Sequence, residues 1–392
     1  METNMNVLSL FDGMSCGQIA LKELGIVPNI YYASEIDKFA IAQTQLNFPN
    51  TIQLGSVTDV NVNDLNRIDL LIGGSPCQAF SFAGKRNGMS TTTNEEIYTL
   101  DRYLELKHNG FQFEGQSYLF WEYMRILTEI RKCNPEVKFL LENVAMGKKW
   151  ERVLSEAIGV YGVHINSALV SGQNRKRIYW TNIKTRQEGL FGQTYSDIPQ
   201  PKDRGIFLRD ILEDEVQDKY YLSDKAISRL ERARTDFKPL VTPFESETRA
   251  LIRGIAKGGD TSSYIKVDKQ LNTIAGKDNL VIQLNPSKES GGQQPYQQNR
   301  IYGTDGKSPA LMAQLCCGSN AILDLNERQI RNHKDSKVEA RIRRLTPTEC
   351  ARLQTIPDWY KWDCSDTQQY SMLGNGWTVE VIKHIFSFLS SI

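Results

Sequence analysis

The chain has 392 residues, a formal net charge of +1 and a hydrophobic fraction of 40%, so it can bury a sizeable core in one large domain or two smaller ones. It contains no apolar run near the roughly 18 residues that a membrane span needs. Its first residues, METNMNVLSLF, lack the charged and small-residue flanks of a secretory signal. We therefore expect a cytoplasmic protein with no membrane partner, in which any basic surface is local.

The stretch up to Lys184 alternates short aliphatic runs with amphipathic segments of helical length, a pattern typical of a parallel sheet covered by helices. The predicted strands are Val7–Leu10, Ile30–Ser34, Ile52–Leu54, Leu70–Ile72 and Lys138–Leu141. The predicted helices are Gly17–Leu24, Lys38–Asn47, Tyr118–Cys133 and Lys149–Ile158. Two further runs, Val163–Val170 and Arg177–Ile183, are close enough in sequence to form an antiparallel pair at one end of the sheet.

From Lys184 to about Lys337 the composition changes to Gly, Ser, Gln, Asn and Lys, with only short strand-like runs. Two segments here are weakly similar: Leu271–Ile282 and Ser308–Leu323. The similarity predicts a β-rich module that contains two similar hairpin elements.

Helical signals return near the end of the chain. Thr346, Pro347 and Glu349 form a capping box with proline at the first helical position, so a helix should begin there. A final helix is predicted by one apolar stripe, formed by Val379, Ile382, Ile385, Phe386 and Leu389. The expected architecture is α/β: a Rossmann-like domain of residues 1–204 and 336–392, interrupted by a smaller β-rich module of residues 205–335.

A glycine-containing loop, Phe11–Gly17, follows the first predicted strand and opens a helix. Glycines at such a turn allow a nucleotide-like ligand to approach the backbone, and Glu35, which ends the next strand, can bond ribose hydroxyls. The pattern alone is weak, since many α/β proteins that bind other ligands share it.

The strongest local signal is Gly73–Gln78, which places Cys77 just past the fourth predicted strand. Parallel α/β enzymes hold reactive groups at this end of their strands, although a free cysteine is more often a buried structural residue. The seven cysteines, an odd number at irregular spacing, favour reduced thiols. Glu142 lies at the matching end of the next strand.

This pairing of a thiol with an acid indicates a particular chemistry. The four histidines lie outside the motifs, so a Cys–His pair is unsupported: they are His108, His164, His333 and His384. A thiolate with a carboxylic acid suits addition to C6 of a pyrimidine while the acid engages N3, which makes C5 electron-rich.

Two more motifs are weak signals alone and are interpreted together with the thiol and the acid. In Gly172–Arg177, Arg175 and Arg177 alternate along an extended segment, so both can point to one site, one towards a base carbonyl oxygen and the other towards a phosphate. Charged turns of this kind are mostly solvated surface. In Met372–Trp377, the glycines permit a tight turn and Trp377 can pack on an adenosyl ligand, although a lone Trp is more often a core residue.

With these motifs in order, the chain resembles the DNA cytosine-C5 methyltransferase family over its residues up to Ile183 and from Val338 onwards. Three motif sequences are especially similar to those of the bacterial and phage enzymes and of the de novo eukaryotic branch: Ser9–Gly13, Gly73–Cys77 and Phe120–Tyr123. The resemblance implies a class I S-adenosylmethionine-dependent methyltransferase sheet with helices on both faces, and a target-recognition domain at 205–335.

It also implies the reaction and its residues. A methyl group would pass from S-adenosylmethionine to C5 of a flipped cytosine in a specific duplex sequence, through a covalent adduct between Cys77 and C6. Glu142 would engage N3 and N4, and Arg175, with Arg177 beside it, would contact O2. No metal is implied. The implied cofactor-binding residues are Phe11, Gly13, Gly17, Glu35, Ile36, Ser56, Val57, Pro76, Leu119, Asn375 and Trp377.

The chain departs from the family pattern at two places. Ser56 stands where many members have Asp, so the contact to the adenine amino group falls to Ser56 or to Asp59. An insertion between Gly88 and Phe113, with a helix-like run Leu100–Lys107, lengthens the loop after Cys77. That loop closes over DNA in the family, so we expect closure here to use extra contacts or to be slower.

The expected partners are S-adenosylmethionine and duplex DNA, with a cognate restriction endonuclease as a candidate protein partner and a monomer acting on DNA. A tRNA cytosine-C5 methyltransferase remains an alternative, against which the separate recognition module argues. A catalytically silent DNA-binding relative would not need Cys77 and Glu142. A methyltransferase with a protein or small-molecule acceptor leaves the thiol unexplained. Basic clusters such as Lys148–Lys149 and Arg341–Arg344 are candidates for phosphate contacts or for ordinary solvated surface.

Overall fold

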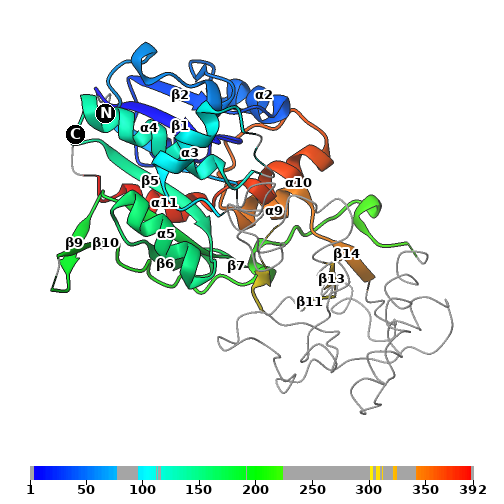
Figure 1. Ribbon diagram of the computed structural model, residues 1–392. Helices are drawn as coiled ribbons and strands as arrows, with labels where there is room; N and C mark the ends of the chain where they lie inside the picture. Colours follow the sequence, from blue (N-terminus) through cyan, green and yellow to red (C-terminus); the bar gives the residue numbers. More distant parts are fainter. Residues whose placement is uncertain are drawn as a thin grey trace, which may run out of the picture.

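A computed structural model provides the structure of the chain. It describes residues 4–76, 96–111, 113, 116–190, 192–223, 301–302, 306–309, 311, 321–324 and 341–389. Within these residues a seven-stranded sheet has the order β3-β2-β1-β4-β5-β8-β6 (Figure 1).

The sheet is mostly parallel, as the sequence predicts. Its strands are β1 (Asn6–Leu10), β2 (Ile30–Ser34), β3 (Ile52–Gln53), β4 (Leu70–Gly74), β5 (Lys138–Val144), β6 (Val163–Asn166) and β8 (Lys176–Thr181). The pairs among β1 to β5 are parallel, and β8 pairs antiparallel with both β5 and β6. The antiparallel pair at one end of the sheet is therefore confirmed. Strand β5 runs past its predicted end because β8 pairs with it as far as Val144, so Glu142 lies inside a strand.

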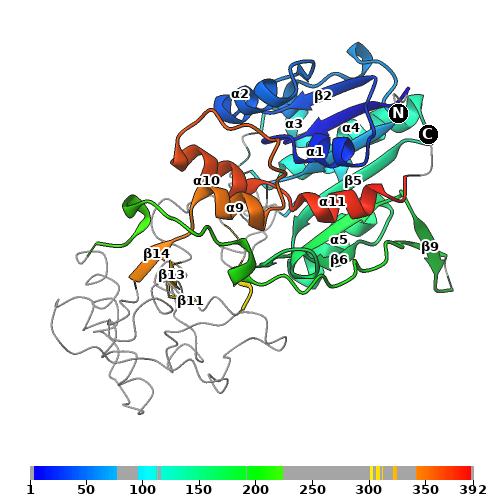
Figure 2. The ribbon, with the colours of Figure 1, turned by 180° about the vertical axis from the view of Figure 1, so that it is seen from behind.

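Helices cover both faces of the sheet (Figures 1 and 2). On one face lie α1 (Cys16–Glu23) and α11 (Val379–Phe386), and on the other lie α4 (Leu119–Cys133) and α5 (Lys148–Ile158). Strand β1 serves both cores, since Val7 packs on the side of α1 and α11 while Leu8 and Leu10 pack on the side of α4. Each such fully buried aliphatic side chain contributes about 1.5–3 kcal/mol to folding.

The remaining helices agree with the sequence patterns. Helix α2 (Lys38–Asn47) begins after Asp37, whose carboxylate accepts from Phe39 N, and α3 (Leu100–His108) matches the helix-like run of the insertion. Helix α9 (Pro347–Leu353) begins with the predicted capping box. Among the described residues, no helix combines the length and the apolar character needed to cross a bilayer.

The Met372–Trp377 motif lies across the end of a helix. Helix α10 (Asp366–Asn375) begins with a capping box between Ser365 and Gln368 and includes Gly374 in its last turn. Gly376, which has a φ of −67°, is the residue that follows the helix, so the break that the glycines permit comes at the second glycine of the motif rather than the first.

The described residues of the inserted module, 205–335, form two short 3₁₀ helices, Leu208–Ile211 and Asp218–Tyr220, and short strands. Strands β11 (Ile301–Tyr302), β13 (Ala321–Asp324) and β14 (Arg341–Arg344) form one sheet, while β12 (Ser308–Pro309) pairs with β7 (Gln173–Asn174). The hairpin predicted over 308–323 is therefore wrong, because β12 and β13 join different sheets. Its predicted counterpart at 271–282 lies outside the described residues. The domain limits stay a prediction.

One further hairpin, of β9 (Thr185–Glu188) and β10 (Gln193–Ser196), extends from the α/β layer.

Candidate functional site

The carboxyl ends of β4 and β5 bring Gly74 and Glu142 together as register partners of the parallel ladder. The buried carboxylate of Glu142 forms an ion pair with Arg177, 2.9 Å from Nε to Oε1. The indole Nε1 of Trp377 donates to its other oxygen at 3.2 Å. Three of the predicted site residues, from two strands and the segment before α11, therefore meet at one edge of the sheet.

Gly74 is required by this arrangement. A Cβ atom at position 74 would lie 2.9 Å from Nε1 of Trp377, closer than real Cβ contacts come, and 3.2 Å from Oε2 of Glu142, tighter than most of them. The second glycine of the Gly73–Gln78 motif thus keeps the acid and the indole against the strand end.

The next residue, Asn143, was missed by the sequence analysis. Its amide Nδ2 donates to the Ser75 carbonyl at 3.2 Å and to Ser75 Oγ at 3.0 Å, which fixes the backbone leading into Pro76. The signal was its position directly after Glu142, since successive strand residues face opposite sides of a sheet. Pro76 is the last described residue here, and Cys77 lies outside the described residues.

The two arginines that were expected to point the same way contact different groups. Arg177 meets Glu142, whereas the buried guanidinium of Arg175 donates to the carbonyls of Leu311, Gly374 and Gly376 at 3.1, 3.3 and 3.0 Å. The regular alternation breaks between them, because β7 ends before Arg175 and β8 begins after it. Arg175 therefore ties the end of α10 to the strand layer.

The loop after β1 has an unusual backbone. Phe11, Gly13 and Ser15 all adopt positive φ angles, of 58°, 59° and 64°. Asp12 is buried between them, and its Oδ1 accepts from the hydroxyl of Tyr31 at 3.0 Å. Its Oδ2 and the buried Oγ of Ser15 make no hydrogen bond of regular geometry, although the Ser9 and Ser15 hydroxyls lie close enough to the carboxyl to oppose the effect of burial on its pKa. Desolvation by burial raises the pKa of Asp12 to about 6.

Glu35 connects this loop to the end of β2. Its Oε2 accepts from Gly13 N at 2.8 Å, and its Oε1 accepts from the backbone N–H groups of Ile36 and Asp37 at 2.7 and 2.9 Å. Ile36 beside it is 73% exposed, an apolar surface at the mouth of the loop. Gly17 lies in α1, where it packs against Ile72 of the sheet.

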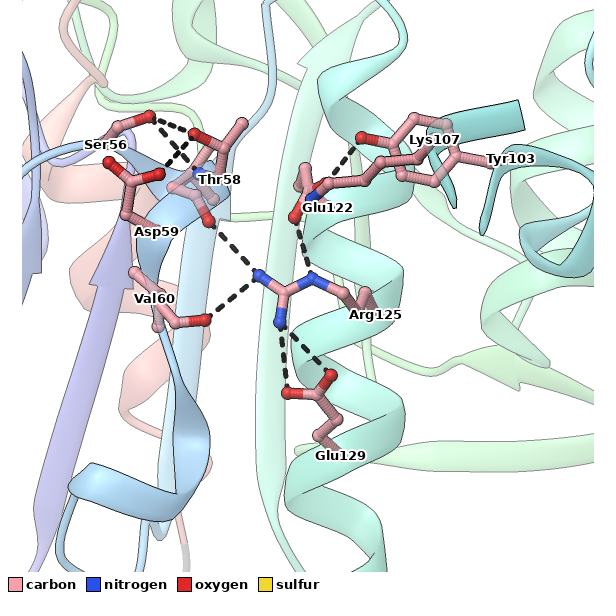
Figure 3. A network of polar contacts seen from close by, with 10 residues as sticks. Ser56, Thr58, Asp59, Val60, Tyr103, Lys107, Glu122, Arg125 and Glu129 are labelled. Carbon is pink, nitrogen blue, oxygen red and sulfur yellow. Dashed lines mark hydrogen bonds and ion pairs between the residues drawn. The ribbon is translucent and has the colours of Figure 1, made fainter. Parts of the chain in front are cut away.

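The segment after β3 begins with Ser56, whose Oγ caps a short helix, η1 (Val57–Asp59). That oxygen accepts from Thr58 N at 3.3 Å and lies 2.7 Å from the Thr58 hydroxyl, as Figure 3 shows. Val57 is buried against the side of α4, the helix that begins at Leu119. Asn375 is exposed at the end of α10.

One residue in each of two basic clusters has an ion-pair partner within the protein. Arg343 is fully buried and forms two hydrogen bonds of 2.8 Å with the equally buried Glu349, so it cannot meet a phosphate. Lys149 forms an ion pair of 2.6 Å with Glu96.

A mostly parallel sheet whose ligand-facing loops follow β1, β2 and β4 defines a Rossmann-like α/β enzyme. The family model of the C-5 cytosine-specific DNA methylases matches residues 5–391. The chain therefore belongs to this family, and it is a DNA methyltransferase.

Curated relatives from phage and bacteria align over nearly the whole chain. The orphan methyltransferase M.SPRI of Bacillus phage SPR is 26% identical and aligns over 98% of this chain and 97% of its own. The type II methyltransferase M.HgiCI of Herpetosiphon aurantiacus is 27% identical, over 95% of this chain and 94% of its own.

Solved structures share the fold. The S. pombe Dnmt2 methyltransferase has a TM-score of 0.56 at 15% identity, covering 98% of each chain. The Entamoeba histolytica methyltransferase EhMeth has a TM-score of 0.57 at 12% identity, covering 99% of this chain and 98% of its own. At these identities the likeness concerns the architecture alone.

Proposed function

We propose that the protein methylates C5 of a flipped cytosine in a specific duplex DNA sequence, with Cys77 as the nucleophile. The observation that carries the proposal is the Glu142 carboxylate, held by Arg177 and Trp377 against Gly74, at the strand end that leads to Cys77. A nucleophile of this kind requires an acid on the ring that it attacks, and the neighbouring strand supplies one.

The chemistry divides among the residues of the chain. The Cys77 thiolate adds to C6, and the electron pair of the C5–C6 bond moves towards C5 while Glu142, as the acid, holds a proton at N3. S-adenosylmethionine supplies, when bound, an electrophilic methyl group on a sulfonium. Loss of the C5 proton to a base then expels the thiolate and restores the aromatic ring. The cytosine must leave the helical stack for C6 to be reached.

Arg177 is the better candidate for the contact to the base O2. It stands beside Glu142, whereas the guanidinium of Arg175 binds backbone carbonyls of α10 and of Leu311. We assign Arg175 a positioning role, since it holds the segment that carries Asn375 and Trp377.

S-adenosylmethionine as the donor fits the loops after β1 and β2. The buried Asp12 Oδ2 and Ser15 Oγ, which make no hydrogen bond of regular geometry, are suited to the ammonium and carboxylate of its amino-acid end. Glu35 is suited to the ribose hydroxyls and the exposed Ile36 to the adenine face. The other residues proposed to hold the cofactor are Phe11, Gly13, Gly17, Ser56, Val57, Pro76, Leu119, Asn375 and Trp377.

The proposal is tested by expressing the protein in a host free of cytosine methylation and mapping 5-methylcytosine across the genome. We expect modified cytosines confined to one short consensus sequence, and none with Cys77→Ala. Purified protein should transfer labelled methyl groups to duplex DNA carrying that sequence rather than to tRNA. Methylation of tRNA alone would refute the choice of acceptor.

A further inference from the structure

A buried ion network lies behind the segment that begins with Ser56 and Val57 (Figure 3). At its centre is Glu122, in the first turn of α4, whose side chain is fully buried. One carboxylate oxygen accepts hydrogen bonds of 2.5 Å from both the Tyr103 hydroxyl and the Lys107 ammonium of α3. The other takes a bond of 2.8 Å from Nε of Arg125. A buried carboxylate needs such cationic partners, so α3 and α4 are joined through it.

Arg125 extends the network to the backbone after β3. While its Nε binds Glu122, its Nη1 donates to both oxygens of Glu129 at 3.1 Å. Its Nη2 donates to the carbonyls of Val57 and Val60 at 3.3 and 3.1 Å. Only a planar, forked guanidinium serves these three directions at once, and a lysine ammonium cannot.

The backbone that Arg125 holds has little structure of its own. Helix η1 is a single 3₁₀ turn of three residues, and such turns have poor hydrogen-bond geometry and low intrinsic stability. Its internal hydrogen bonds are few: the Asp59 N–H bond to Ser56 O at 3.0 Å, the Ser56 cap, and side-chain bonds of the Thr58 hydroxyl with Ser56 Oγ and Asp59 Oδ1. The path from Val57 to Val60 therefore depends on the guanidinium behind it.

Helix α4 carries both a proposed cofactor contact and the arginine of the network. It begins with Leu119, a proposed cofactor contact, and Arg125 lies two turns further on, bonded to the carbonyl of Val57, another proposed contact. A change in Arg125 thus reaches the site through Val57 without touching the reacting atoms.

We propose that Glu122 and Arg125 are positioning residues for the adenine end of the S-adenosylmethionine site, and that Lys107 and Tyr103 of α3 set the cofactor affinity through them. This inference rests on the proposed function. Helix α3 belongs to the insertion that distinguishes the chain from the family pattern, so the network gives this insertion a role in cofactor binding.

The test compares full-length variants by calorimetric titration with two probes. S-adenosylhomocysteine carries the whole adenosyl and amino-acid framework, and 5′-methylthioadenosine lacks the amino-acid end. For Arg125→Lys we expect the Kd of both probes to rise by the same factor, about tenfold, as for the loss of a charge-assisted hydrogen bond. Lys107→Met should raise both Kd values by a smaller common factor. Lys107→Arg, which keeps the positive charge, should leave both near the wild-type values. In turnover, the KM for S-adenosylmethionine should rise while kcat at saturation holds.

The matched control is Lys132→Met, the same substitution at an exposed position in the last turn of α4, which should leave both Kd values unchanged. A purely structural network would lower the Tm of the variants with no change in either Kd, and that result would overturn the inference. A loss confined to S-adenosylhomocysteine would overturn it too, because it would locate the effect at the amino-acid end. If Arg125→Lys does not fold, the two Lys107 variants decide. Absence of binding by the unaltered protein would instead refute the proposed function.

Discussion

At the scale of single residues, the environment of Glu142 determines what it can do. Its two oxygens face two different donors, the Arg177 guanidinium and the Trp377 indole, so the plane of the carboxylate is fixed before any base arrives. Fixed orientation of a catalytic acid removes an entropic cost from the transition state. The same contacts explain why position 74 of β4, opposite Glu142 of β5, is a glycine.

Glu142→Gln should lower kcat by about 10²–10⁴-fold, the usual contribution of a positioned acid, because the amide cannot protonate N3. The Trp377 contact survives the change, so DNA affinity should stay within a few-fold of the wild type. Steady-state methyl transfer and a gel-shift titration measure the two quantities. Glu136→Gln, at an exposed position before β5, is the control. Equal loss of both quantities would show that Glu142 acts in binding rather than in catalysis.

Asp12 gives the unliganded protein a pH dependence of stability. Its pKa in the folded state, about 6, lies above the ordinary value of 3.8 because burial disfavours its charge. The folded state therefore holds the proton more tightly between these values, and stability falls as pH rises from about 4 to about 6. Two pKa units correspond to about 3 kcal/mol. Urea unfolding across this range should show the decline, and Asp12→Asn should flatten it. A wild-type curve that rises over the same window would contradict the assignment.

At the scale of elements, the start of α9 depends on a buried charge pair. Glu349 closes the capping box with Thr346, binds Arg343 of β14, and accepts from Glu213 N at 2.9 Å. One side chain thus joins a helix, a strand and the segment before residue 214.

Glu349→Gln should lower the free energy of unfolding by about 3–5 kcal/mol, because it leaves the Arg343 charge buried and uncompensated. The double variant Arg343→Met/Glu349→Met should lose much less than Glu349→Met alone. The double-mutant cycle of Arg343→Met, Glu349→Met and the double variant, measured by urea unfolding, detects this. The exposed pair of Arg152 and Glu156 is the control, and Glu156→Gln should cost at most about 0.5 kcal/mol. Additive losses at residues 343 and 349 would rule out the coupling.

Local patterns in the sequence predicted most helices and strands. They did not predict contacts between residues that are far apart in the chain. Helix α2 matches its predicted bounds, and the Thr346 cap is read from neighbouring letters. Arg175 could not be interpreted in the same way, since its carbonyl partners at Leu311 and Gly374 are far away in the chain. Which of the two glycines in Met372–Trp377 follows the helix end could not be predicted, because a glycine is tolerated in a last helical turn. The ion network of Glu122 depends on where α3 docks, which no periodicity encodes.

For the candidate site, the sequence predicted that the Gly73–Gln78 motif and Glu142 come together, because parallel strands end at one edge. The contact of Trp377 with Glu142 was not predicted, since Trp377 was expected to pack on an adenosyl ligand. The division of labour between the two arginines was not predictable. It follows from the strand break at residue 175, which only the fold reveals.

At the scale of the whole molecule, a net charge of +1 must coexist with binding to a polyanion if the proposal holds. Affinity then depends on local basic groups that release counterions, so the logarithm of Kd for duplex DNA should rise linearly and steeply with the logarithm of salt concentration. Fluorescence anisotropy measures the slope between about 50 and 200 mM salt. Over this range a protein with several phosphate contacts loses affinity by about a hundredfold or more. A flat response would exclude duplex DNA as the partner.

The central claim is that the sulfur at position 77 adds to C6 of the target cytosine. A duplex with 5-fluorocytosine at the mapped target position, incubated with the protein and S-adenosylmethionine, tests it most directly, because fluorine at C5 cannot leave as a proton does. We predict a complex of one protein and one duplex that survives denaturing electrophoresis and is absent with Cys77→Ala. Normal methylation of ordinary cytosine without any trapped complex, or a complex that persists in Cys77→Ala, would contradict the account.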